Sequence, residues 1–119
     1  MDNRLPREEI LQKKRDFERV LFHGKQLRAS PVVLYYAPSR AGSRRIAFIT
    51  SGRFQTNVTR NRVKRRLREL FRTNKGSFQP GFDFILRGTP EVADIEFAAL
   101  RETVLKLADT IKERMKSEL

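Results

Sequence analysis

Residues 59–73, TRNRVKRRLRELFRT, carry the clearest structural signal of the chain, because they join one apolar stripe to a dense run of bases. The side chains of the stripe recur at the three- and four-residue intervals of one side of an α-helix: Thr59, Val63, Leu67, Leu70 and Phe71. The spacing predicts a helix from Thr59 to about Thr73, with this stripe packed into a hydrophobic core.

The opposite side of the same segment is strongly basic. Residues 60–72 contain seven bases and one acid, Glu69, for a net charge of +6. At about 100° per residue, four side chains share a narrow stripe, with Lys64 beside it: Asn61, Arg65, Arg68 and Arg72. A guanidinium group binds two phosphate oxygens at once, and solvated helix surfaces usually mix both signs of charge. The segment therefore predicts a polyanion-binding helix rather than an ordinary surface.

Two further helices flank this segment in the sequence. The first extends from about Glu8 to His23, or begins near Lys13, and Gly24 ends it. Its apolar positions lie near one face: Ile10, Phe17, Val20 and Leu21. The last helix is capped by Asp94 and ends at about Lys116. Its core-facing positions alternate spacings of three and four: Phe97, Leu100, Val104, Leu107 and Ile111.

Short β-branched and aromatic runs predict strands at 31–37, 45–50 and 82–87, with a further short strand around 25–28. In the 31–37 run, PVVLYYA, both alternating sets are apolar: Val32, Leu34 and Tyr36 on one face, and Val33, Tyr35 and Ala37 on the other. Residues 38–45 and 75–81 contain Pro and Gly and predict loops. The element order predicts a single-domain α+β fold over 1–119, an α/β sandwich of about four strands and three helices. The ends, about 1–8 and 116–119, are expected to be flexible.

The composition narrows the partner to a polyanion. The formal net charge is +12, and hydrophobic residues make up 39% of the chain. The first 90 residues hold a net charge of +14 and residues 91–119 a net charge of −2, so the polyanion site is expected before residue 91. The chain has no cysteine, no apolar run of membrane-spanning length and no signal-peptide pattern, which favours a cytoplasmic protein with no membrane partner.

The run RNRVKRRLRELFR at 60–72 closely resembles the arginine-rich signature of the bacterial ribonuclease P protein subunit. The flanking segments agree: DFERVLFHG at 16–24 is similar to the first helix of that family, and VLY at 33–35 to its aromatic strand. PGFD at 80–83 is similar to the entry to its last strand. The resemblance covers roughly residues 13–112 and implies an α/β sandwich with a left-handed crossover.

The resemblance also implies a function. In that family a large RNA subunit cuts the 5′ leader from precursor tRNA with magnesium ions, and the protein binds that RNA and the single-stranded leader. The residues implied for binding the RNA subunit are Arg60, Asn61, Arg62, Arg65, Arg66 and Arg72. Those implied for the leader cleft are Phe17, Tyr35, Lys64 and Arg68, with Arg15, Leu21 and Arg53 as further candidates. No cofactor, metal or catalytic group is expected on the protein, which is expected to be monomeric.

The chain departs from the family pattern at a few positions. Leu21 stands where an aromatic residue is common, so one stacking platform is missing. Gly52 and Gln55 stand where a lysine and a glycine are common, and Ala47 replaces another glycine. Arg53 keeps one base in this loop. The path of residues 51–59 is therefore not predicted.

Three other functions were weighed against this one. A structural binder of ribosomal RNA would not need aromatic side chains on the sheet beside the first helix. A DNA-binding helix would follow a short helical partner, whereas a strand and a loop precede this one. A protein-only nuclease would need clustered carboxylates, and the acids show no convincing cluster. His23, the only histidine, is read as a partner of the helix dipole rather than as a general base.

Overall fold

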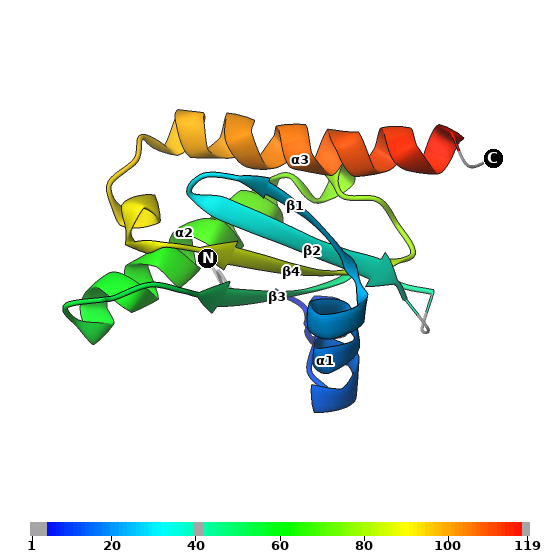
Figure 1. The fold of residues 1–119 in the computed structure, drawn as a ribbon, viewed down its shortest axis with the longest axis horizontal. Coiled ribbons are helices and arrows are strands. Elements are labelled where there is room, and N and C mark those ends of the chain that lie inside the picture. Colours follow the sequence, from blue (N-terminus) through cyan, green and yellow to red (C-terminus); the bar gives the residue numbers. More distant parts are fainter. Residues whose placement is uncertain (1–4, 40–41, 118–119) are drawn as a thin grey trace.

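The computed structural model describes residues 5–39 and 42–117, which form one mixed sheet with three helices packed on it (Figure 1). The strands, in chain order, are β1 (Lys25–Ala29), β2 (Val32–Pro38), β3 (Arg45–Thr50) and β4 (Phe82–Gly88). The helices are α1 (Lys14–His23), α2 (Asn57–Thr73) and α3 (Phe97–Ser117). Short 3₁₀ turns occupy Arg7–Glu9, Lys75–Ser77 and Pro90–Ala93. The predicted α+β class and all four strands are confirmed.

The sheet has the order β1-β2-β4-β3, with β1, β2 and β4 antiparallel and β3 parallel to β4. A parallel pair needs a crossover connection, and α2 supplies it between β3 and β4. In Figure 1 both strands point the same way and pass in front of α2, which makes this crossover left-handed. The rare handedness agrees with the family resemblance, since crossovers of this kind are nearly always right-handed.

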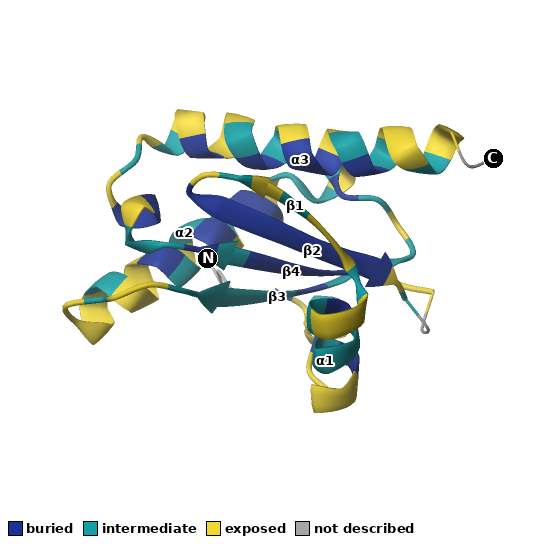
Figure 2. Ribbon diagram, viewed as in Figure 1, coloured by how far each residue is buried: buried dark blue, intermediate teal, exposed yellow. Residues whose placement is uncertain are grey.

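The larger core lies between the sheet and the pair α2 and α3. The alternation of β2 places Val32, Leu34 and Tyr36 in this core, as predicted. Figure 2 shows α3 with its dark-blue buried side toward the sheet and its yellow exposed side outward. Gly88 is required where α2 crosses β4, because an added Cβ would lie 3.0 Å from Val92 and 3.1 Å from Leu67.

The smaller core lies on the opposite face of the sheet, beneath α1. Val33, Tyr35 and Ala37 from β2 meet Ile85 from β4 and Val20 from α1 in this cluster. Phe17 and Leu21 of α1 pack against it from the side and remain partly exposed. Both faces of β2 are therefore covered, which explains its continuous run of apolar residues.

The structure corrects four boundaries. α1 begins at Lys14 rather than near Glu8, because Ile10 pairs with Ile46 at the edge of β3. α2 begins at Asn57. Asp94 ends the Pro90–Ala93 turn and does not cap α3, which begins at Phe97. Leu5 is only 6% exposed, so the flexible start predicted for 1–8 is wrong from this residue on.

Residues 1–4 and 118–119, the outer parts of the predicted flexible ends, lie outside the described residues. Lys116 and Ser117 of the predicted tail belong to α3. Among the helices described, none combines the length and the apolar character that a bilayer span requires.

Candidate nucleic-acid interface

The basic helix α2 is anchored firmly along its apolar side. Val63, Leu67, Leu70 and Phe71 are all 0% exposed, and burial of each large side chain contributes about 1.5–3 kcal/mol. At the N-terminus, the Thr56 side chain accepts a hydrogen bond from the backbone N–H of Thr59 at 3.2 Å. The helix is therefore a rigid support for the side chains on its outer side.

Four of the predicted RNA-binding positions are open to solvent on this outer side: Asn61, Arg62, Arg65 and Arg68. The structure does not keep all the basic side chains in one stripe, however. Because arginine side chains are long, neighbours along the stripe reach different flanks of the helix.

One flank of α2 faces the edge of the sheet at β3. The Arg68 guanidinium lies over the Phe48 ring, 5.9 Å from its centroid. Arg68 and Lys64 line a hollow of about 240 Å³, whose other walls come from β3 and from the segment that crosses its edge: Leu5, Ile10, Ile46, Ala47 and Phe48. Ala47 also packs against the smaller core, so this hollow adjoins the sheet face that carries Tyr35.

The other flank of α2 faces the turn before α3. Arg66 donates a hydrogen bond to the backbone carbonyl of Val92, and its guanidinium lies 5.8 Å from the centroid of the Phe97 ring. Arg65 borders a hollow with Arg66, Glu69 and Phe97. Arg66 thus ties two elements together, a structural role that the sequence did not predict.

Arg72 is engaged by the single acid of the helix. Its Nε and Nη2 donate to the two carboxylate oxygens of Glu69, at 3.0 and 2.5 Å. This hydrogen bonding lowers the pKa of Glu69 and raises the pKa of Arg72. The pair compensates the charge of Arg72, so this predicted contact is less available to RNA than Arg65 or Arg68.

The loop before α2 and its first turn present two more predicted residues. Arg60 lies over the Phe54 ring at 5.4 Å, and its Nη1 donates to Asn57 Oδ1 at 3.3 Å. Arg53 is exposed in the loop, next to Gly52, which has a φ of 92° that favours glycine. The structure thus defines the loop whose path the sequence left unpredicted.

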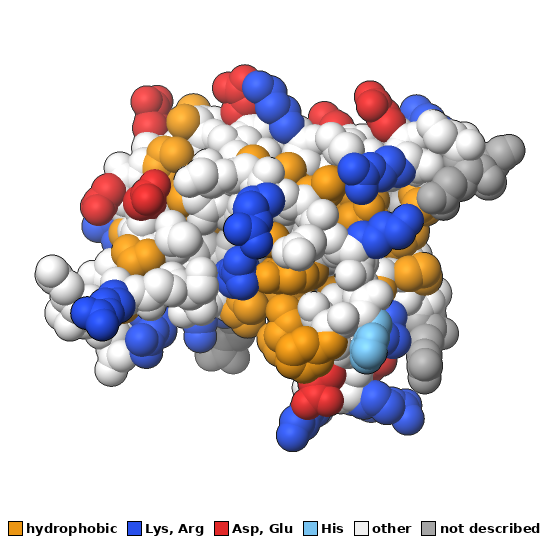
Figure 3. Space-filling view, viewed as in Figure 1, with side chains coloured by type: hydrophobic (Ala, Val, Ile, Leu, Met, Phe, Trp, Pro, Cys, Tyr) orange, Lys and Arg blue, Asp and Glu red, His pale blue; other side chains and the backbone are white. Residues whose placement is uncertain are grey.

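The sheet face under α1 brings Phe17 and Tyr35 into one cluster, as predicted. Tyr35 is only 6% exposed, and the Arg87 guanidinium lies 5.4 Å from the centroid of its ring. Leu21 packs in the same cluster, whereas Arg15 is exposed on α1. Figure 3 shows hydrophobic side chains at the surface beside α1, with Lys and Arg side chains near them. Of these two rings, Phe17 is therefore the more open to a base.

A buried ionic cluster, which the sequence analysis missed, fixes α1 to this face. Asp83 is 0% exposed and accepts from Arg45 Nε at 2.9 Å and from Arg19 Nη2 at 2.5 Å. Asp16, directly before Phe17, lies 3.5 Å from Arg45 Nη1 and 3.7 Å from Arg19 Nη2. The hydrogen bond to Asp83 raises the pKa of Arg45. One signal was available: Asp83 shares the strand face of Ile85, where an unpaired carboxylate would be costly.

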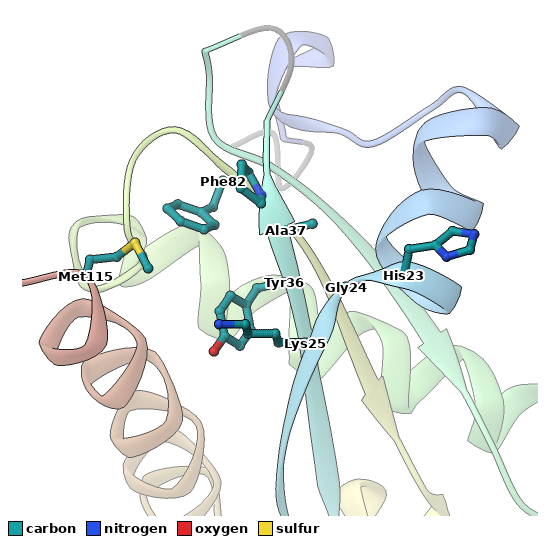
Figure 4. Close-up of a pocket in the computed structure, with 8 residues that line it drawn as sticks. His23, Gly24, Lys25, Tyr36, Ala37, Phe82 and Met115 are labelled. Atoms are coloured by element: carbon teal, nitrogen blue, oxygen red, sulfur yellow. The ribbon is translucent and has the colours of Figure 1, made fainter. Parts of the chain in front are cut away.

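A second hollow, of about 250 Å³, lies between the end of β2 and the end of α3. Figure 4 shows Phe82, Tyr36 and Met115 around it, while the His23 ring points away. The Tyr36 hydroxyl accepts a hydrogen bond from Arg114 Nη1 at 2.9 Å. Its mainly apolar lining gives this hollow no means of holding a polyanion, and His23 has no acid or base partner there.

The described residues bring no group of three histidine or acidic side chains together in a way that could hold a metal ion. The two buried carboxylates, Asp16 and Asp83, are occupied by Arg19 and Arg45. The site therefore combines positive charge, arginine forks and ring faces, which is chemistry for binding. It defines a strongly basic α+β protein that holds a polyanion against a fixed helix.

Comparison with known proteins gives the family. The family described as Ribonuclease P matches residues 5–112. A ribonuclease P protein component from Pelotomaculum thermopropionicum is 33% identical over 99 residues, covering 83% of this chain and 88% of the relative. That from Petrotoga mobilis is 34% identical over 105 residues, covering 85% and 89%. The chain belongs to the ribonuclease P protein family, of the bacterial type.

The solved structures agree with the fold. The RNase P protein from Thermotoga maritima superposes with a TM-score of 0.75 at 28% identity, covering 86% of this chain and 96% of that one. An RNase P protein mutant from Staphylococcus aureus superposes with a TM-score of 0.76 at 21% identity, covering 88% and 89%. The second likeness concerns the fold alone.

Proposed function

We propose that this chain is the protein subunit of a ribonuclease P holoenzyme, which removes the 5′ leader of precursor tRNA. In this assignment the catalytic RNA is bound by residues of α2 and its first turn: Arg60, Asn61, Arg62, Arg65, Arg66 and Arg72. The single-stranded leader lies along the sheet face beside α1, at Phe17, Tyr35, Lys64 and Arg68. The observation that carries the proposal is a basic helix with a fully buried apolar side, next to a sheet face that presents aromatic rings.

The chemistry of the two surfaces suits the two RNAs. Arginine forks on a rigid helix bind phosphates without reading sequence, which suits a large folded RNA. A ring that stacks on an unpaired base contributes about 1–3 kcal/mol and tolerates any base. Leaders differ between tRNAs, so tolerant stacking is the property this surface needs. A base reaches Tyr35 only beside Arg87 or in its place, because the guanidinium lies over the ring.

The protein itself is assigned no chemical step. The catalytic RNA supplies the reaction, and magnesium ions belong to that RNA, since Arg19 and Arg45 occupy both buried carboxylates of the protein. The protein acts as a monomer in the cytoplasm, with no DNA or membrane partner. Purified, RNA-free protein is expected to leave precursor tRNA uncut.

Reconstitution tests the proposal. The protein is mixed with the catalytic RNA of a bacterial ribonuclease P, and the cleavage of precursor tRNA is measured at low magnesium with and without protein. Cleavage is expected to increase with the protein, because its bases neutralise phosphates that magnesium would otherwise neutralise. No increase at any protein concentration would contradict the assignment.

A matched pair of variants sharpens the experiment. Arg65→Ala with Arg68→Ala should weaken RNA binding for all sequences alike and flatten its dependence on salt, by about 0.7–0.9 per phosphate contact in a plot of log K against log salt. Arg101→Ala with Lys106→Ala removes the same charge from α3 and should leave the slope nearly unchanged. Equal slopes for both pairs would remove Arg65 and Arg68 from the phosphate contacts.

A further inference from the structure

We propose that Arg28 and Arg87 form a phosphate-binding subsite on the sheet face, one step beyond Tyr35 and away from α1. Its ligand is one backbone phosphate of a single-stranded RNA. The proposal rests on the function proposed above and extends the leader path beyond the rings.

The strand register brings the two arginines to either side of one residue. Arg28 on β1 pairs with Val33 on β2, and Val33 pairs with Arg87 on β4. Neighbouring strands lie about 4.8 Å apart, so the two Cα atoms are separated by roughly 10 Å across the sheet. Because arginine side chains are long, both guanidinium groups can reach one phosphate over Val33.

The adjoining row of the sheet contains Tyr35, which pairs with Gln26 on β1 and Ile85 on β4. Two residues along a strand span about 6.8 Å, close to the spacing of successive nucleotides in an extended strand. A base on the ring of Tyr35 would therefore place a neighbouring phosphate over Val33. If that base displaces Arg87 from the ring, the released guanidinium lies beside this phosphate.

The charges around the pair are not compensated. Arg19, Arg45 and Arg72 all have carboxylate partners, whereas neither Arg28 nor Arg87 pairs with an acid anywhere in the described ranges. They line a hollow of about 260 Å³ that has no acidic side chain among its described walls. A pair of free guanidinium groups over an apolar floor favours an anion.

Hydroxyl groups complete the subsite. Ser30, Ser51 and Thr89 line the same hollow. The Oγ1 of Thr89 is covered from solvent, and no hydrogen-bond partner for it occurs among the described residues. These neutral donors suit phosphate oxygens and read no base, which agrees with tolerance of leader sequence.

The test is a series of precursor tRNAs whose leaders are shortened one nucleotide at a time. Binding to the reconstituted holoenzyme is measured with the natural protein and with Arg28→Gln plus Arg87→Gln. With the natural protein, affinity should fall about tenfold when the leader becomes too short to bring a phosphate to the subsite. The double variant should lose that step, keep its affinity for the shorter leaders, and show a salt slope lower by about 0.7.

The control is Arg101→Gln with Lys106→Gln, which removes the same charge from α3 and should keep the step. Thermal unfolding of each variant without RNA separates loss of binding from loss of folding. A double variant that keeps both the step and the slope would overturn the subsite while leaving the proposed function intact. If the natural holoenzyme does not distinguish precursor from mature tRNA at all, the proposed function fails instead.

Discussion

Phe17 is the side chain through which α1 is expected to contact the leader. It is partly exposed, while the Asp16 carboxylate next to it is tied to the sheet through Arg45. Phe17→Ala should therefore weaken the binding of precursor tRNA about 5- to 100-fold, the equivalent of one lost stacking contact. The binding of mature tRNA should hardly change, because it has no leader.

The measurement is the affinity of the reconstituted holoenzyme for precursor and mature tRNA, compared for the two proteins. Leu21→Ala is a useful control, because it trims the same cluster without removing a ring. Equal losses for precursor and mature tRNA would assign Phe17 to the core rather than to the leader.

Gly24 ends α1 for a reason of space. Its φ is −80°, which any residue adopts, but an added Cβ would lie 2.5 Å from the Val20 carbonyl oxygen and 2.7 Å from that of Tyr36. Gly24→Ala should lower the free energy of unfolding by roughly 1–3 kcal/mol, because the backbone must shift to accept the methyl group. Chemical denaturation measures this loss.

Gly76→Ala is the matched control, since nothing lies within 4 Å of its added Cβ. It should change the free energy of unfolding by about 0.5 kcal/mol or less, as is usual for an open surface position. Similar effects for both glycines would show that the space around Gly24 relaxes freely.

At the scale of elements, α2 holds back part of its own charge. Glu69 occupies both donors that Arg72 directs along the helix. Glu69→Gln should free Arg72 and add one positive charge, so RNA affinity should rise and the salt slope should steepen by about 0.7–0.9. Affinity titrations at several salt concentrations measure both quantities.

The same pair predicts the effect of acid. The pKa of Glu69 is lowered in the folded protein, so the pair stabilises the fold above the ordinary carboxyl pKa and loses this effect as the pH falls through the lowered value. The contribution to stability is small because both side chains are partly exposed. Glu102→Gln on α3 also adds one charge and is the control. An increase of affinity equal to that of Glu69→Gln would point to net charge alone.

The elements themselves were largely predictable from local patterns. The alternation of 31–37 predicted which β2 residues face each layer, and the spacing in 59–73 predicted the buried side of α2. Contacts between distant residues were not predictable. The start of α1 depends on the Ile10–Ile46 bridge, and the ionic cluster joins Arg19 to Asp83, 64 positions away. The spread of the α2 arginines depends on which ring or carboxylate lies within reach.

For the molecule as a whole, a net charge of +12 implies self-repulsion that a polyanion relieves. Millimolar inorganic triphosphate should raise the midpoint of thermal unfolding, because it binds the folded arrangement of arginines more tightly than the unfolded chain. The measurement compares triphosphate with sodium chloride at the same ionic strength. The Arg65→Ala and Arg68→Ala protein should show a smaller rise, and an equal rise in triphosphate and chloride would rule out a specific anion surface.

The segment that crosses the edge of β3 has a practical consequence for handling the protein. Leu5 is buried, and the Leu11 backbone N–H donates to the Ile46 carbonyl at 3.0 Å, so these residues cover strand backbone that would otherwise pair with a neighbouring molecule. An affinity tag fused close to Leu5 would compete with this covering and invite aggregation. A tag or fluorophore is better attached after Ser117, where α3 ends.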